Sequence, residues 1–176
     1  MPDGQSVNID ELHAELGIPS GYGSDPYLPR YGDCTDLVAV EPNIIGRRQK
    51  LAATTAGDWA RMKEAALLDG IELLIVSGFR SIGYQVELFR KKLSSGQPIS
   101  KILAVNAAPG HSQHHTGTAI DIATRGSRPL TEAFETTPAF DWLSRRGTEF
   151  GFKMPYGRAN RFGIDYEPWH WSQVDD

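Results

Sequence analysis

The strongest pattern of apolar and polar positions along the chain is a helical repeat that follows Leu51. Lys63 and Glu64 fall on the polar side of this repeat. Its apolar positions are Trp59, Met62, Ala66 and Leu67. Because residues three and four positions apart share one face of a helix, the pattern predicts a core helix that ends near Asp69 and Gly70.

A second helical pattern follows Ser81 or Gly83, either of which is suited to begin a helix. The expected inner face consists of Tyr84, Leu88 and Phe89. The run Arg90-Lys91-Lys92 lies near the predicted end, where positive charge interacts favourably with the helix dipole. We interpret this basic run as a solvated helix end that could also meet an anionic polymer.

Two shorter segments complete the predicted helices. Residues 99–105 predict a short helix. Thr137 followed by Pro138 is typical of a helix start, with a capping hydroxyl and then Pro at the first helical position. This last helix is expected to continue to Gly151, although Gly147 inside it costs roughly 1 kcal/mol of helix stability.

Strand-like segments lie between these helices. Residues 37–40 form a short candidate strand, and residues 71–76 are apolar enough for a strand that is buried on both faces for most of its length. Residues 152–154 and 166–171 are the candidates nearest the C-terminus. Glu167 and His170 are three positions apart and would face opposite sides of a regular strand, so we predict a bend at Pro168.

The first part of the chain has the weakest pattern. Residues 10–16 predict two helical turns with Asp10 as the cap and Gly17 as the stop, and a loop rich in Gly, Pro and Tyr follows. We therefore divide the chain into an N-terminal extension or surface wrap, residues 1–35, and one domain, residues 36–176. A length of 176 residues suits a single core.

Charge and composition exclude several classes of protein. The formal net charge is −4 and the basic residues are scattered, which argues against nucleic-acid binding. The single cysteine, Cys34, excludes an internal disulfide and lies in no Cys/His constellation, and no G-x-S-x-G motif is present. Neither a secretory signal peptide nor an apolar run of transmembrane length is found in the chain.

Candidate chemistry is concentrated in residues 109–121. This stretch holds the imidazoles of His111, His114 and His115 in a Gly-containing loop, followed by Asp121. A catalytic zinc ion needs three nitrogen or oxygen ligands and an open position for water. Any of these imidazoles could supply a ligand on chemistry alone.

Asp121 is the polar position of a strand-like run, residues 118–123. Alternation sends Ile120 and Ile122 to one face and Asp121 to the other. An ionised carboxylate between buried residues costs several kcal/mol unless it is paired. A bound cation would provide the partner.

Three segments resemble one family. Residues 112–121 fit the pattern S-x-H-x-x-G-x-A-x-D, and residues 167–171 fit E-x-W-H-W. Residues 77–81, with Gln85 beyond them, are similar to an upstream substrate-binding element. The chain thereby resembles the zinc D-alanyl-D-alanine carboxypeptidases of the VanY and VanX type, in a superfamily with lysostaphin and the hedgehog N-terminal domain.

The resemblance implies a set of site residues. It selects one zinc ion per chain with the ligands His114, Asp121 and His170. It implies that Glu167 is the general base and that Arg80 is catalytic and also contacts substrate. Gln85 and Ser112 are the further implied substrate contacts. His111 and His115 remain rivals for metal or substrate contact, and Asp165 is a possible hydrogen-bond partner of a ligand imidazole.

The implied fold class is α+β, with a small, mainly antiparallel sheet, helices packed on one side and a zinc cleft on the other. The implied activity is hydrolysis of peptidoglycan stem peptides, with removal of a terminal D-alanine preferred. A peptidoglycan endopeptidase of the L-alanyl-D-glutamate type and a non-catalytic zinc-binding module are the alternatives. Such a substrate implies a periplasmic or cell-wall location, or release on lysis. The sequence sets neither the compartment nor the oligomeric state.

Overall fold

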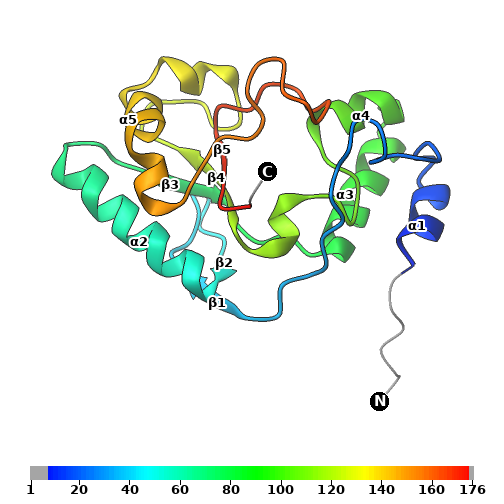
Figure 1. Ribbon diagram of the computed structural model, residues 1–176, viewed down its shortest axis with the longest axis horizontal. Helices are drawn as coiled ribbons and strands as arrows, with labels where there is room; N and C mark the ends of the chain where they lie inside the picture. The colour runs from blue at the N-terminus through cyan, green and yellow to red at the C-terminus, as the bar shows by residue number, and fades with distance from the viewer. Residues whose placement is uncertain (1–7, 175–176) are drawn as a thin grey trace.

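A three-stranded antiparallel sheet, in the order β3-β4-β5, lies at the centre of the molecule (Figure 1). The computed structural model describes residues 8–174, so residues 1–7 of the predicted N-terminal extension lie outside the described residues. A separate two-stranded hairpin, β1-β2, lies beside the sheet. The strands are β1 (Leu37–Val40), β2 (Gln49–Ala52), β3 (Leu74–Ser77), β4 (Ala119–Ala123) and β5 (His170–Ser172).

Two of the helices, α2 and α5, share the main core with one face of the sheet (Figure 1). Ile120 and Ile122 of β4 enter this core together with Trp59 and Met62 of α2 and Trp142 of α5. The helices are α1 (Ile9–Glu15), α2 (Ala53–Leu68), α3 (Ile82–Ser94), α4 (Ile99–Val105) and α5 (Pro138–Arg146), with 3-10 helices η1 (Gln113–Thr116), η2 (Glu132–Thr136) and η3 (Gly147–Phe150). The α+β prediction, with a small antiparallel sheet, is confirmed.

A second apolar cluster joins α1, α3 and α4 on the other side of the molecule (Figure 1). Leu16 and Ile18, which follow α1, pack there against Phe89 of α3 and Ile102 of α4. Asp121 lies on the face of β4 opposite to Ile120 and Ile122. No helix within residues 8–174 combines the length and the apolar character needed to span a membrane.

Several predicted helices and one predicted strand are confirmed, while some details of the helices are wrong. The ranges of β1 and α4 agree with the sequence patterns, and Ser81 caps α3 by accepting from the backbone N–H of Tyr84 at 3.0 Å. The predicted inner face of α3 is wrong at Tyr84, which is 54% exposed, because Gln85 takes the buried position. Leu67 of α2 is exposed as well, and Asn8 rather than Asp10 caps α1.

The predicted strands are shortened in the structure. β3 begins at Leu74 instead of Ile71, and residues 152–154 contribute only an isolated bridge between Lys153 and Ser172. The predicted last strand, residues 166–171, is replaced by a turn and the short β5. The bend expected at Pro168 is present, because the backbone N–H of His170 donates to the carbonyl of Glu167 at 3.1 Å.

The helix predicted up to Gly151 changes at Gly147, where α5 gives way to the 3-10 helix η3. A Cβ atom at position 147 would lie 3.0 Å from the ring of Trp171 and 3.3 Å from the carbonyl of Phe152. Glycine therefore lets the end of α5 approach β5 closely, and this packing outweighs its low helix propensity.

Gly117, after η1, brings the loop of residues 109–117 against the β1-β2 hairpin. Its φ is +70°, its carbonyl accepts from the backbone N–H of Ala52, and an added Cβ would lie 2.8 Å from that nitrogen. We predict that Gly117→Ala lowers the free energy of unfolding by about 2–4 kcal/mol, through left-handed strain and overpacking. Chemical denaturation measures the change.

Gly126→Ala is the matched control for this prediction. Gly126 has a similar φ of +81°, but nothing lies within 4 Å of its added Cβ. The control should lose only the conformational part, about 1–2 kcal/mol. Equal losses in both variants would show that the close approach at Ala52 contributes nothing.

Candidate active site

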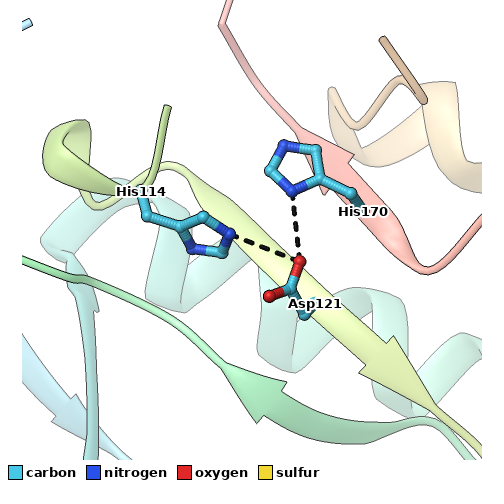
Figure 2. A group of neighbouring side chains, drawn as sticks. All are labelled: His114, Asp121 and His170. Atoms are coloured by element: carbon cyan, nitrogen blue, oxygen red, sulfur yellow. Dashed lines mark hydrogen bonds and ion pairs between the residues drawn. The ribbon is translucent and has the colours of Figure 1, made fainter. Parts of the chain in front are cut away.

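The sheet and the loop before it bring three predicted ligands together. Asp121 on β4 lies directly opposite His170 on β5, so their side chains share one face of the sheet. The loop ending in η1 adds His114 from the side (Figure 2). All three side chains are buried, and one candidate ligand atom from each lies within 4.8 Å of the others.

The geometry of this group fits a metal ion. His114 Nε2 lies 3.3 Å and His170 Nδ1 lies 3.1 Å from Asp121 Oδ1 (Figure 2). Two ligands of a tetrahedral zinc ion, at bond lengths of about 2.0–2.1 Å, are separated by about 3.3 Å. The observed separations therefore match those of ligands on a shared ion.

The tautomer of His114 strengthens this fit. Its Nδ1 lies 2.7 Å from the carbonyl oxygen of Gly78, which can only accept, so Nδ1 carries the proton. Nε2 then carries a lone pair that points toward the Asp121 carboxylate. This nitrogen is buried without a hydrogen-bond partner within residues 8–174. Two facing acceptors repel one another unless a cation lies between them.

Protonation of His114 does not resolve this repulsion at neutral pH. Burial, aided by the positive charge of Arg80, lowers the pKa of His114 to about 4. For Asp121, burial opposes ionisation, but its polar and charged surroundings, Arg80 among them, hold its pKa well below the ordinary value. The site thus presents a neutral imidazole and an ionised carboxylate, the protonation states that metal ligands require.

Gln113 holds the other imidazole. Its Oε1 accepts from Nε2–H of His170 at 2.9 Å, which leaves the Nδ1 lone pair of His170 for the centre of the group. Sequence reasoning missed this contact, since Gln113 occupies an unspecified position of the motif. Asp165, the candidate partner at the sequence level, makes no hydrogen bond to either imidazole among the contacts of the described residues; its backbone N–H donates to Ala104.

Glu167 lies beside the group, at the start of the turn that leads to His170. Its Oε2 is 4.0 Å from His170 Nδ1, and its backbone N–H donates to the carbonyl of Tyr156 at 2.9 Å. Burial, followed by the negative charge of Asp121, raises the pKa of Glu167 to about 8. A carboxyl group in this environment can exchange protons near neutral pH.

The predicted substrate residues meet in a small pocket beside Glu167. Arg80, Gln85 and Ser112 all line it, in a volume of about 30 Å³. Arg80 Nη2 lies 3.4 Å from Asp121 Oδ2, while Arg80 Nε and Gln85 Oε1 are buried without partners among the described residues. Unsatisfied donors and acceptors of this kind are available to a polar ligand.

Two further pocket residues escaped the sequence analysis. Asn106 follows α4 and donates from Nδ2 to the carbonyl of Ile102 at 3.0 Å, and Tyr156 packs its ring 4.7 Å from that of His170. Both line the small pocket. Neither belongs to a recognised motif, so only the fold brings them to the site.

The rival imidazoles have structural contacts and are not part of the three-residue group. His115 Nδ1–H donates to the carbonyl of Arg80 at 2.7 Å, while its Nε2 accepts from Gly110 at 3.1 Å. His111 Nδ1–H donates to the carbonyl of Leu28 at 3.0 Å. These bonds connect the site loop to neighbouring segments.

The N-terminal segment lies against the same loop. His13 Nε2–H donates to the carbonyl of Pro109 at 2.8 Å, and the backbone N–H groups of Tyr31 and Cys34 donate to the carbonyls of Gly110 and His115. These contacts support the loop that carries His114. Within the described residues the predicted wrap therefore contacts the active-site loop directly.

Comparisons with known proteins agree with the motifs. A family model described as VanY, D-alanyl-D-alanine carboxypeptidase, matches residues 48–176. The protein YodJ of Bacillus subtilis (strain 168) is 36% identical over 151 residues, which cover 81% of this chain and 55% of YodJ. The chain spans about half the length of the curated relatives it matches.

Solved structures share the fold. The LD-carboxypeptidase LdcB superposes with a TM-score of 0.73 at 32% identity, covering 83% of this chain and 72% of that chain. The D,D-pentapeptidase VanY of a VanB-type resistance cassette, solved with Zn(II), has a TM-score of 0.63 at 23% identity, covering 84% and 86%. At that identity the second likeness shows the fold alone.

We predict that zinc binds at His114, Asp121 and His170 and raises the thermal stability of the chain. At a free zinc concentration 100 times the dissociation constant, the stabilisation should be about 2.7 kcal/mol. His114→Ala should abolish the zinc-induced shift in melting temperature, measured by calorimetry against its own metal-free state. His111→Ala is the matched control and should keep the shift; the reverse result would exchange the roles of these imidazoles.

Proposed function

Since this chain belongs to the VanY family of D-alanyl-D-alanine carboxypeptidases, we propose that it is a zinc-dependent peptidase that removes the terminal D-alanine from bacterial cell-wall peptides. The observation that carries the proposal is the facing pair of His114 Nε2 and Asp121 Oδ1, 3.3 Å apart and buried. That pair needs a cation, and it lies beside a buried carboxyl group and an arginine.

One zinc ion would be held by His114, Asp121 and His170. Nitrogen and oxygen donors in this number suit a catalytic zinc with a remaining open position. When bound, zinc lowers the pKa of coordinated water to about 7 and polarises the substrate carbonyl. The Gly78 carbonyl and the Gln113 amide would hold the two imidazoles in the required tautomers.

Glu167 would be the proton carrier of the reaction. It would accept a proton from the attacking water as the new C–O bond forms. It would then deliver that proton to the amine nitrogen as the C–N bond of the peptide breaks. Burial beside Asp121 raises the pKa of Glu167 to about 8, and a nearby cation would lower it toward neutrality.

Arg80 would bind the terminal carboxylate of the substrate. A guanidinium can grip a carboxylate with two parallel hydrogen bonds, and Arg80 Nε is buried without a partner among the described residues. Ser112 and Gln85 would add contacts to the last residue. The pocket volume of about 30 Å³ suits a small side chain such as that of alanine.

A second candidate is an LD-carboxypeptidase, which would cut the terminal D-residue from an L-residue. The likeness to LdcB, at 32% identity and a TM-score of 0.73, favours this variant of the same chemistry. Both candidates share the metal group, the base and the carboxylate contact. They differ in the configuration of the residue before the scissile bond.

Glu167→Gln should retain one zinc ion per chain and lose turnover by about 10²–10⁴-fold, because the amide cannot carry the proton. Metal content by mass spectrometry and peptide hydrolysis by chromatography measure the two effects. Glu64→Gln, on the outer side of α2, is the control and should leave both unchanged. Full turnover in Glu167→Gln would remove the proposed base.

Synthetic peptides of one length distinguish the candidate activities. We expect release of a single alanine from peptides ending in D-Ala-D-Ala, suppression by a chelator and slower cleavage when the C-terminus is amidated. Preference for an L-residue before the terminal D-alanine would select the LD-carboxypeptidase. Internal cleavage at equal rates with free and amidated ends would indicate an endopeptidase. Mass spectrometry of the products identifies the bond.

A further inference from the structure

A wide cleft adjoins the small pocket and is not used by the chemistry described above. It encloses about 800 Å³, and Arg80 and Asn106 line both spaces. Its walls come from the β1-β2 loop, the end of β3, the outer face of α3 and the loop at Pro129. Ligand sites in proteins commonly enclose about 300–1,000 Å³, so the cleft is large enough for several peptide residues.

The cleft is strongly basic although the chain carries a net charge of −4. Its cationic lining residues are Arg47, Arg48, Lys50, Arg80 and Lys92. Asp121, the proposed metal ligand, is the single carboxylate among the residues that line it. Burial, followed by the positive charge of Arg80, lowers the pKa of Lys92, as expected inside a positive potential.

Apart from Arg80, which lies 3.4 Å from Asp121, these cations lack the carboxylate partners that several other arginines of the described chain have. Arg90, Arg125, Arg146 and Arg158 are each paired with glutamates or aspartates. Within residues 8–174, no ion pair involves the side chains of Arg47, Arg48, Lys50 or Lys92. Unpaired like charges in one cleft repel each other, so an anionic ligand would relieve them.

Exposed apolar side chains border the same cleft. Ile44, Ile45, Tyr84 and Leu130 are exposed large hydrophobic residues, and all of them line it. Leu130 also has a φ of +55°, an uncommon conformation for a leucine that is often found at functional sites. Cations and apolar groups together suit a peptide, which offers carboxylates and side chains, better than a purely anionic polymer.

We propose that this cleft binds the part of the substrate peptide that precedes the scissile bond. Arg47 and Arg48 recognise a free carboxylate on that part, either on a side chain or as a main-chain α-carboxylate that is not in a peptide bond. The inference rests on the proposed function, because it takes the small pocket as the place of the terminal residue. The remaining peptide must then leave through the adjoining space. The enzyme accordingly favours peptides that carry a free carboxylate before the scissile bond over peptides that carry an amide at the same position.

The test uses peptides that end in D-Ala-D-Ala and carry one glutamate, or one glutamine, at successive positions before this dipeptide. At one or more positions the glutamate peptide should bind at least about fivefold more tightly than its glutamine partner. Fluorescence anisotropy with the zinc-loaded Glu167→Gln protein measures the dissociation constant, and KM for the unmutated enzyme provides a second measurement. High salt should reduce the difference.

The double variant Arg47→Gln/Arg48→Gln should abolish the preference, so that the glutamate and glutamine peptides bind it with equal affinity. The hairpin should persist, because Arg47 and Arg48 contribute only backbone atoms to the hydrogen bonds of its turn. Arg61→Gln/Arg145→Gln removes the same charge outside the cleft and should retain the preference.

The outcomes separate the two proposals. Equal affinities for glutamate and glutamine peptides at every position, or equal losses in both double variants, overturn the carboxylate subsite even when hydrolysis proceeds. A glutamate preference in binding without hydrolysis by the unmutated protein upholds the subsite and refutes the proposed function.

Discussion

The buried carboxylate of Asp121 is the constraint on which the rest of the structure depends. Its side chain is 7% exposed, yet its nearest polar neighbours are two imidazole nitrogens and a guanidinium nitrogen 3.4 Å away. The Gly78 carbonyl and Gln113 leave lone pairs on both imidazoles facing it. Lone pairs that face a buried carboxylate are costly unless a cation lies between them, and Arg80 approaches only the outer oxygen, Oδ2.

Holding this arrangement requires several segments to meet, and backbone hydrogen bonds at one loop achieve it. The backbone N–H of Arg80 donates to the carbonyl of His114, and His115 returns a bond to the carbonyl of Arg80. The segment that leaves β3 is thereby joined to the loop before β4. The N-terminal segment contacts the other side of that loop through Tyr31 and Cys34. The loop that carries His114 is thus held by hydrogen bonds on both sides.

The sequence predicted the parts of the site that depend on short-range patterns. Alternation around Asp121 identified its face, and the spacing of Glu167 and His170 required the bend that the turn supplies. Gln113 and Asn106 were missed, since their roles depend on partners or pocket walls that only the fold assembles. The face of α3 was misjudged for the same reason: Gln85 is buried because its side chain donates to the carbonyl of Ala107. The shortened final strand reflects Pro168, which has no N–H for a sheet.

The distribution of charge distinguishes the site from the rest of the surface. Elsewhere in the described chain several arginines are paired with neighbouring carboxylates, as Arg146 is with Asp69 and Glu149. Such exposed ion pairs contribute little to stability. They do neutralise the arginines, which then repel neighbouring cations only weakly. Beside Asp121 the balance is different, because the cleft is lined by cations and Asp121 is the single carboxylate among its lining residues. Like charges in one cleft repel each other, and a bound carboxylate would reduce that repulsion. The cleft is therefore better suited to recognising an anionic ligand than to stabilising the fold.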